Sequence, residues 1–180
     1  MLGVTDKILE WCARALIGIG SVAVVLMMVH VMAEVLVRYF LTASIPGTEE
    51  IVSGYYMVAV VFLPLGYVQY ERGHVIIELF TLKLSSRSKA WLDACVLAVC
   101  AAALSVFTYA GYVKALRMTA RNEIWIGLID VAIWPSRWML PAGLLVMTLI
   151  MVVQSIQEFH SAITGKGHHE PRHAEDVESV

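Results

Sequence analysis

Three ionisable residues share one face of a strongly apolar stretch of the sequence. His30, Glu34 and Arg38 follow one another at intervals of four residues, which stacks their side chains along one side of a helix. A carboxylate four residues before an arginine has the favourable order for an ion pair within a helix. Ionisable groups in apolar segments indicate either a proton or ion path or a structural pair. Because Glu34 and Arg38 lie near the end of the stretch, we interpret them as a structural pair that joins helices or subunits.

The connection that follows leads to two more carboxylates. Thr48 is expected to cap the next helix, and Glu49 and Glu50 lie in its first turn, where the helix dipole favours negative charge. The short connection brings these carboxylates back to the side of Arg38. We therefore expect Glu34, Arg38, Glu49 and Glu50 to form one charged corner that holds two helices together or contacts a partner.

These residues belong to apolar stretches that are each about long enough to cross a bilayer. A hydrocarbon core of ~30 Å needs ~20 residues of helix, and helices satisfy their own backbone groups in lipid. Hydrophobic residues make up 59% and charged residues 16% of the 180 residues, which excludes an ordinary soluble domain. The sequence predicts an all-α integral membrane protein with a membrane domain at 1–160 and four transmembrane helices, at 15–36, 51–70, 90–112 and 139–156.

The segments beside the spans differ in character. Residues 4–14 have an apolar and a charged face, which predicts an amphipathic helix in the membrane interface. Pro64 predicts a bend in the second span, since proline lacks a backbone donor. Residues 75–84 are apolar but too short to span, and are expected at the interface. Residues 161–180 are polar and histidine-rich, and are expected to form a disordered cytoplasmic tail.

The distribution of lysine and arginine predicts the orientation. Eight of these 13 residues lie on the side of the two termini and the second connection, and five lie on the other side. The positive-inside rule therefore places both termini of this multi-pass protein in the cytoplasm.

A basic face follows the third span, on the predicted outer side. Lys114, Arg117 and Arg121 share one side of a helix that is expected to continue past the bilayer. Two interpretations stay open, which are contact with lipid phosphates and a periplasmic docking face for an acidic partner. The sequence predicts no catalytic residue, no metal site and no cofactor.

The order of several short motifs resembles a known family. Arg38-Tyr39-Phe40 is followed by Glu49-Glu50-Ile51 at the start of a helix, by Arg72-Gly73-His74-Val75 after it, and by Pro141 in the fourth span. Together with the four-span frame, this order resembles the small, Q-type membrane subunit of tripartite ATP-independent periplasmic (TRAP) transporters, from about Lys7 to Gln157. Two positions depart from the pattern: Gly47-Thr48 stands where a tryptophan is frequent, and Glu71 stands where a basic residue is common.

The resemblance implies a small scaffold and anchoring subunit of a sodium-coupled secondary transporter for an organic acid, located in the bacterial inner membrane. Its partners would be a large multi-span permease subunit, which carries the sodium sites, a periplasmic substrate-binding protein and membrane lipids, with no nucleic acid and no enzymatic activity. Arg72 and His74, at the other end of the second span, would be further structural or partner contacts. Two alternatives from other classes are a four-span haem b electron-transfer protein and a small proton-coupled exporter that uses Glu34.

Overall fold

Four helices in the structure are long and apolar enough to cross a membrane, as the sequence predicts. The computed structural model describes residues 2–71, 86–126 and 129–164. The first, third and fourth of these helices are α1 (Leu2–Leu41), α5 (Ser86–Ala120) and α6 (Met139–Thr164). The second is built from shorter pieces, which are α2 (Thr48–Ile51), the π-helical η1 (Val52–Tyr56), α3 (Met57–Phe62) and α4 (Leu65–Tyr70).

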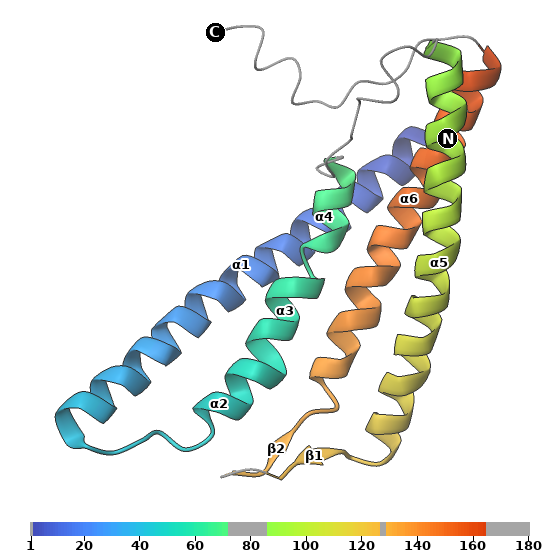
Figure 1. Cartoon of the computed structure of the whole chain (residues 1–180). Helices are drawn as coiled ribbons and strands as arrows, with labels where there is room; N and C mark the ends of the chain where they lie inside the picture. Colours follow the sequence, from blue (N-terminus) through green and yellow to red (C-terminus); the bar gives the residue numbers. More distant parts are fainter. Residues whose placement is uncertain (1, 72–85, 127–128, 165–180) are drawn as a thin grey trace, which may run out of the picture.

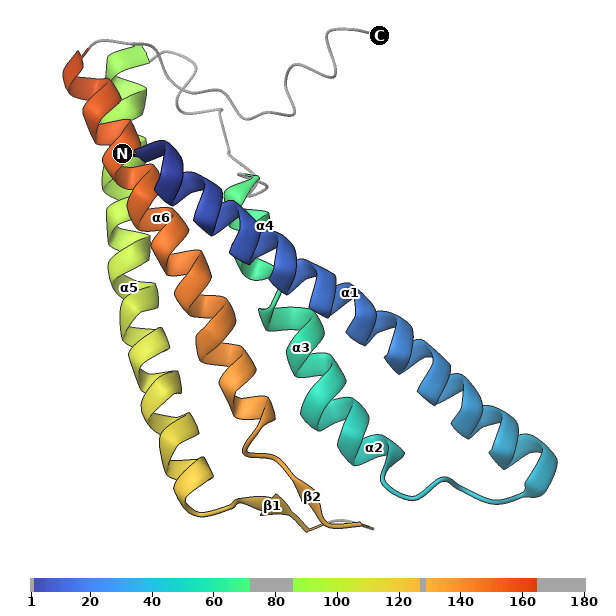
Figure 2. The ribbon, with the colours of Figure 1, turned by 180° about the vertical axis from the view of Figure 1, so that it is seen from behind.

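The helices stand side by side in a row and do not form a closed bundle (Figures 1 and 2). Helix α5 packs along α6, and α6 packs against α3 and α4. Helix α1 contacts the second span and also α6. Each spanning helix contains an apolar segment of 18 residues. In α6, 39% of the residues of this segment are buried within the chain, but in α1 only 11% are. Helix α6 is therefore the centre of the row, and α1 and α5 are its edges.

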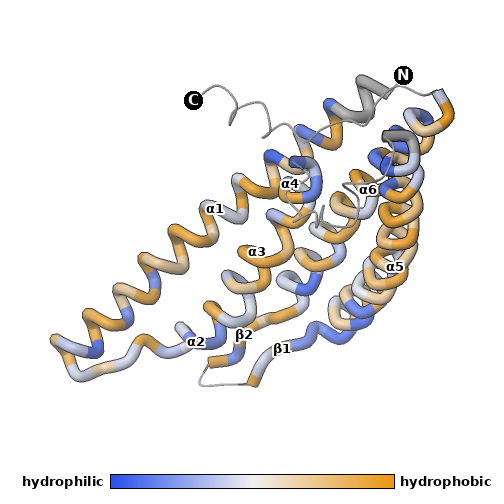
Figure 3. The backbone as a smooth tube through the Cα atoms, turned by 45° about the horizontal axis from the view of Figure 1, so that its top comes forward, coloured by the Kyte–Doolittle hydropathy of each residue, from blue (hydrophilic) through white to orange (hydrophobic). Residues whose placement is uncertain are grey.

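The two ends of the row are different. The start of α1 and the end of α6 lie towards the same end of the row, which we name the terminal end (Figure 1). At the opposite end, β1 (Ile124–Trp125) pairs with β2 (Val131–Ala132) in an antiparallel hairpin, followed by the 3₁₀ turn η3 (Ser136–Trp138). We name this the hairpin end. Figure 3 shows hydrophobic residues along the middle of the helices and hydrophilic residues at their ends.

The core lies between α5 and α6 and is small. Ala101 of α5 packs with Met147 and Met151 of α6, and three partly buried leucines, Leu65, Leu97 and Leu104, pack around them. Alanine on α5 allows the two backbones to approach, which favours packing between helices where no hydrophobic effect drives association. Most other large apolar side chains of α1 and α5 face outwards, as expected for helices that contact lipid or a partner.

The bend predicted at Pro64 is present between α3 and α4. Proline has no N–H for the helical hydrogen-bond pattern, so the helix is interrupted there. Two glycines, one on each neighbouring helix, pack closely against this bend. A Cβ on Gly143 of α6 would lie 1.9 Å from the Phe62 carbonyl oxygen, and a Cβ on Gly20 of α1 would lie 3.2 Å from the Pro64 ring.

The structure differs from the sequence interpretation in its boundaries. Helix α1 runs unbroken through residues 4–14, so this amphipathic segment is the beginning of the first span helix. Helix α6 continues to Thr164, past the boundary expected at residue 160. The hairpin between α5 and α6 was not expected. The interfacial segment at 75–84 and residues 165–180 of the expected disordered tail lie outside the described residues.

Replacing Gly143 by alanine should destabilise the protein, because the new methyl group would collide with the Phe62 backbone carbonyl. Overpacking of this kind costs about 1–3 kcal/mol, and we expect thermal unfolding in detergent at a temperature several degrees lower. Gly18→Ala in α1 is the matched control, because a Cβ there has no atom within 4 Å and alanine favours the helix. Equal melting temperatures for the two variants would show that the close approach at Gly143 does not hold the helices together.

Candidate functional site

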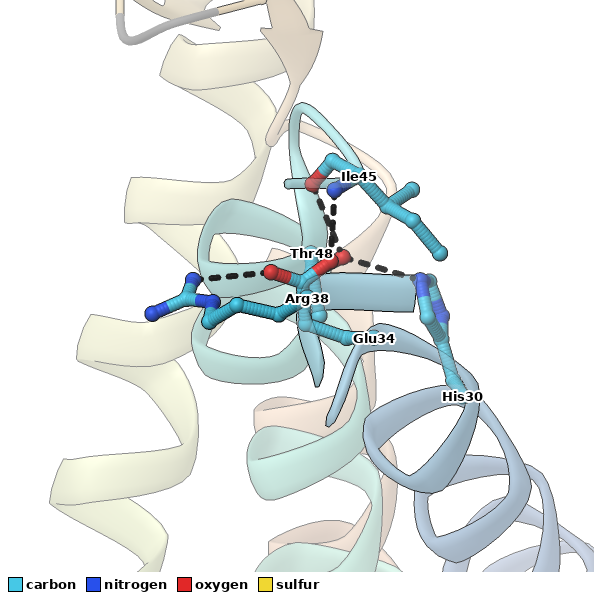
Figure 4. A network of polar contacts seen from close by, with 5 residues as sticks. All are labelled: His30, Glu34, Arg38, Ile45 and Thr48. Atoms are coloured by element: carbon cyan, nitrogen blue, oxygen red, sulfur yellow. Dashed lines mark hydrogen bonds and ion pairs between the residues drawn. The ribbon is translucent and has the colours of Figure 1, made fainter. Parts of the chain in front are cut away.

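The carboxylate of Glu34 is the centre of a polar site at the hairpin end (Figure 4). Its Oε1 accepts a hydrogen bond from Nη2 of Arg38 at 2.8 Å, and its Oε2 accepts the backbone N–H of Ile45 at 2.6 Å. The Glu34 side chain is 11% exposed and that of Arg38 is 69% exposed. The predicted ion pair forms, and Glu34 also fixes the backbone of the first connection onto the end of α1.

Thr48 and His30 extend this site towards the second span. The Thr48 hydroxyl donates to the Ile45 carbonyl at 3.1 Å and lies 3.4 Å from Nε2 of His30. The His30 ring packs edge-on against Tyr56, with 6.0 Å between the ring centroids. The site is therefore a joint between α1, the first connection and the start of the second span.

The expected cap at Thr48 is wrong. The residue before the helix is Gly47, whose φ of +86° lies in the left-handed region, and Thr48 is already the first helical residue of α2. Glycine adopts this conformation without strain. A side chain at Gly47 would also collide with Ile129, which lies after the β1 strand. The Thr48 hydroxyl is thereby directed back to Ile45 and His30.

The two carboxylates of α2 are less enclosed than Glu34. Glu49 is exposed and Glu50 is half-buried. Their first-turn position is the one that the sequence predicts. The joint consists of Glu34, Arg38, Ile45, Thr48 and His30 (Figure 4), so its composition differs from the charged corner expected from the sequence. A partner-contact role for Glu49 and Glu50 stays a prediction. Arg72 and His74 lie outside the described residues.

A second polar joint links the second span to α6 nearer the terminal end. Nε2 of Gln69 donates to Oε1 of Gln154 at 2.7 Å, and Nε2 of Gln154 donates to the Gln69 carbonyl at 3.1 Å. Both residues are buried. This pair is not among the contacts predicted from the sequence, although each of the two apolar stretches contains a glutamine. Interhelical side-chain hydrogen bonds in membrane proteins typically contribute about 0.6 kcal/mol.

The first helix is tied to the same end of the second span. The Tyr70 hydroxyl donates to Oε2 of Glu10 at 2.9 Å, and Arg14 pairs with Oε1 of Glu10 at 2.6 Å. Residues of the segment 4–14 thus contact another helix, while Ile8 and Trp11 of that segment are 58% and 73% exposed. The exposed side is the apolar face predicted to lie in the membrane interface.

The hairpin end is closed by contacts from the third connection. The Tyr55 hydroxyl donates to the Ala132 carbonyl, and the Ile133 N–H donates to the Glu123 carbonyl at 3.0 Å. Trp138 donates its indole N–H to the Thr119 hydroxyl at 3.0 Å. These bonds attach the hairpin to η1 and α5, so that all the connections described at this end are joined to the helices.

The geometry disfavours both alternative functions. A haem b site needs two histidines that face each other at matched depth. Among the described residues, His30 lies towards the hairpin end of α1 and His160 lies in the last two turns of α6 at the terminal end. An exporter based on Glu34 needs a carboxylate that is free to exchange protons. Both oxygens of Glu34 are instead engaged by Arg38 and Ile45.

The apolar helices are those of a multi-pass membrane protein. Residues 27–161 match the family model described as the DctQ component of tripartite ATP-independent periplasmic transporters. The match covers most of the chain, and the chain belongs to this family. It is a component of a transporter, in agreement with the resemblance of its motifs. No curated protein and no solved structure gives a significant match.

Glu34 should matter more for stability than the arginine with which it pairs. Glu34→Ala leaves the Ile45 N–H without its acceptor, which costs about 1–3 kcal/mol when the group is buried. Arg38→Ala removes a largely exposed partner and should cost about 0–1 kcal/mol. Thermal unfolding of both variants in detergent measures this difference. Glu34→Gln is the control, because it keeps an oxygen acceptor and should behave like Arg38→Ala. A larger effect of Arg38→Ala than of Glu34→Ala would contradict the role given to the backbone contact.

Proposed function

We propose that the chain is the small scaffold subunit of a sodium-coupled TRAP transporter for an organic acid. It pairs with a large multi-span permease subunit, which carries the sodium and substrate sites, and it works with a periplasmic substrate-binding protein. The family match supports the transporter class, and the resemblance of the motifs supports this division of labour. The identity of the acid depends on the partners.

The open row of helices is the observation that carries this proposal. Only 11% of the residues in the apolar 18-residue segment of α1, and 17% of those in the corresponding segment of α5, are buried within the chain. A row with two open edges offers long lateral surfaces to lipid and to a larger membrane subunit. Helices of a self-sufficient transporter would instead have to enclose a site near the middle of the membrane.

The polar side chains of the spans support a structural role. Glu34, Gln69 and Gln154 each make hydrogen bonds within the chain, and these bonds link neighbouring elements. Substrate sites in secondary transporters use interrupted helices whose ends point at the ligand. The interruption at Pro64 is instead packed against Gly143 and Gly20. These contacts favour a fixed scaffold over a moving part.

The proposed orientation places both termini in the cytoplasm, which puts the hairpin end in the periplasm. This orientation is supported by the eight lysines and arginines on the side of the termini, against five on the hairpin side. We expect that a membrane-impermeant thiol reagent added to intact cells labels Ser44→Cys and does not label Thr164→Cys. Both positions are exposed, and Cys12, Cys95 and Cys100 are first replaced by alanine. Labelling of Thr164→Cys from outside the cell would contradict the proposed orientation.

The scaffold role predicts that the chain does not transport alone. Liposomes containing only this subunit should take up no carboxylate in a sodium gradient. Liposomes that also contain the large permease subunit and the binding protein should show saturable, sodium-dependent uptake. Omission of this subunit from the complete mixture is the control, and we expect uptake to be lost or strongly reduced. Saturable uptake by the chain alone would contradict the proposal.

A further inference from the structure

The basic face at the hairpin end of α5 continues a line of apolar residues on the same side of the helix. Lys114, Arg117 and Arg121 are all exposed. The Arg121 N–H donates to the Arg117 carbonyl at 3.2 Å, so the helical path continues as far as Arg121. Four exposed apolar residues lie on the same side of α5, nearer the terminal end and at the same spacing of three and four residues: Val99, Ala103, Val106 and Ala110. This line of seven residues is named the outer stripe of α5.

The outer stripe points sideways, away from the rest of the protein. The opposite side of α5 carries the residues that pack on α6, such as Ala94, Ala101 and Ala115, which are at most 4% exposed. Val99 and Val106 of the stripe are 71% and 68% exposed. A water-soluble partner that docks on the hairpin end would meet the loops there and would not reach these apolar residues.

The dimensions of the outer stripe match those of a phospholipid in one leaflet. From Val99 to Ala110 the helix rises about 16 Å, which is close to half of a hydrocarbon core of about 30 Å. The three cations then rise over about 10 Å, through the depth of the headgroups. Tyr109, which is 71% exposed, flanks the stripe beside Ala110, where the apolar part ends. Tyrosine is enriched at the membrane interface.

No ion pair is found for Lys114, Arg117 or Arg121 within the part of the chain that the structure describes. The ion pairs of Arg14 with Glu10 and of Arg38 with Glu34 lie on α1, away from the outer stripe. Arginine binds phosphate oxygens through its planar fork of donors, and lysine binds them as a point charge. Because the apolar and cationic parts follow each other in the order of acyl chain and headgroup, a phospholipid fits both parts.

We propose that the outer stripe of α5 binds an anionic phospholipid of the leaflet at the hairpin end. Its acyl chains lie along Val99 to Ala110, and its phosphate is held by Lys114 and Arg117, with Arg121 beside the headgroup. The lipid supplies the negative charge that this basic end requires and fixes the depth of α5 in the membrane. The site accounts for a cluster of cations that the positive-inside rule does not explain.

The binding of phosphatidylglycerol to the delipidated full-length chain tests this site, with native mass spectrometry in detergent as the measurement. Lys114→Gln/Arg117→Gln should weaken binding by about fivefold per charge, and therefore on the order of 25-fold. Lys7→Gln/Lys89→Gln is the matched control, which removes two charges at the terminal end and should change binding at most slightly. A photoactivatable phosphatidylglycerol should cross-link to the segment 99–121 in the wild-type chain and not in the first variant. Equal binding by the two double variants would overturn the proposal.

Two further experiments distinguish a phospholipid from a small anion and from an acidic protein partner. Inorganic phosphate should not displace the lipid, because it makes no contact with the apolar part; displacement at similar concentrations would reduce the site to a simple anion site and overturn the proposal. In the assembled transporter, Lys114→Gln/Arg117→Gln should retain binding-protein-dependent uptake when assayed in liposomes. Loss of that uptake together with wild-type lipid affinity would assign the basic face to docking of an acidic protein instead.

Discussion

The arrangement of the helices depends on the close approach of α6 to the interruption in the second span. Pro64 removes a backbone donor, so the helix of the second span is interrupted there. The Phe62 carbonyl occupies the place that a side-chain methyl group would take at Gly143 of α6. On the other side of the second span, Gly20 of α1 packs against the Pro64 ring. Once α4 follows α6 from this point, Gln69 meets Gln154. The row of helices thus follows from one backbone contact.

Polar joints are found on both sides of this contact. At the hairpin end, the Glu34 carboxylate fastens the first connection to α1 through the Ile45 N–H. Towards the terminal end, Gln154 and Glu10 fasten the second span to α6 and α1. The outward sides of α1 and α5 remain apolar over most of their length. Internal polar contacts of this kind rigidify the chain, as the proposed scaffold role requires.

The sequence predicts the features that depend on neighbouring residues. Span number follows from apolar length, the bend follows from Pro64, and the Glu34–Arg38 pair follows from a spacing of four residues on one helix. Contacts between distant segments could not be derived in this way. Gln69 and Gln154 are 85 residues apart. The predicted spans place both near the same membrane face, but nothing in the sequence indicates that these two helices are neighbours.

The acceptor role of Glu34 towards Ile45 escaped prediction because it involves a backbone N–H, which every residue type except proline carries. The Thr48 cap failed for a related reason: Gly47 adopts the left-handed conformation against Ile129, and this contact comes from the distant third connection. The hairpin at residues 124–132 escaped because its strands are only two residues long. Loop geometry set by remote segments thus limits what local patterns can predict.

The central claim is that the polar sites of this chain are structural and that ion coupling belongs to the large subunit. The most direct test is to purify the assembled transporter with Glu34→Ala in this chain and to measure both the yield of the complex and the sodium dependence of uptake. The account predicts a lower yield of complex, while every complex that forms keeps the wild-type sodium dependence and substrate affinity. Normal assembly with an altered sodium dependence would contradict it and would place Glu34 in the ion pathway.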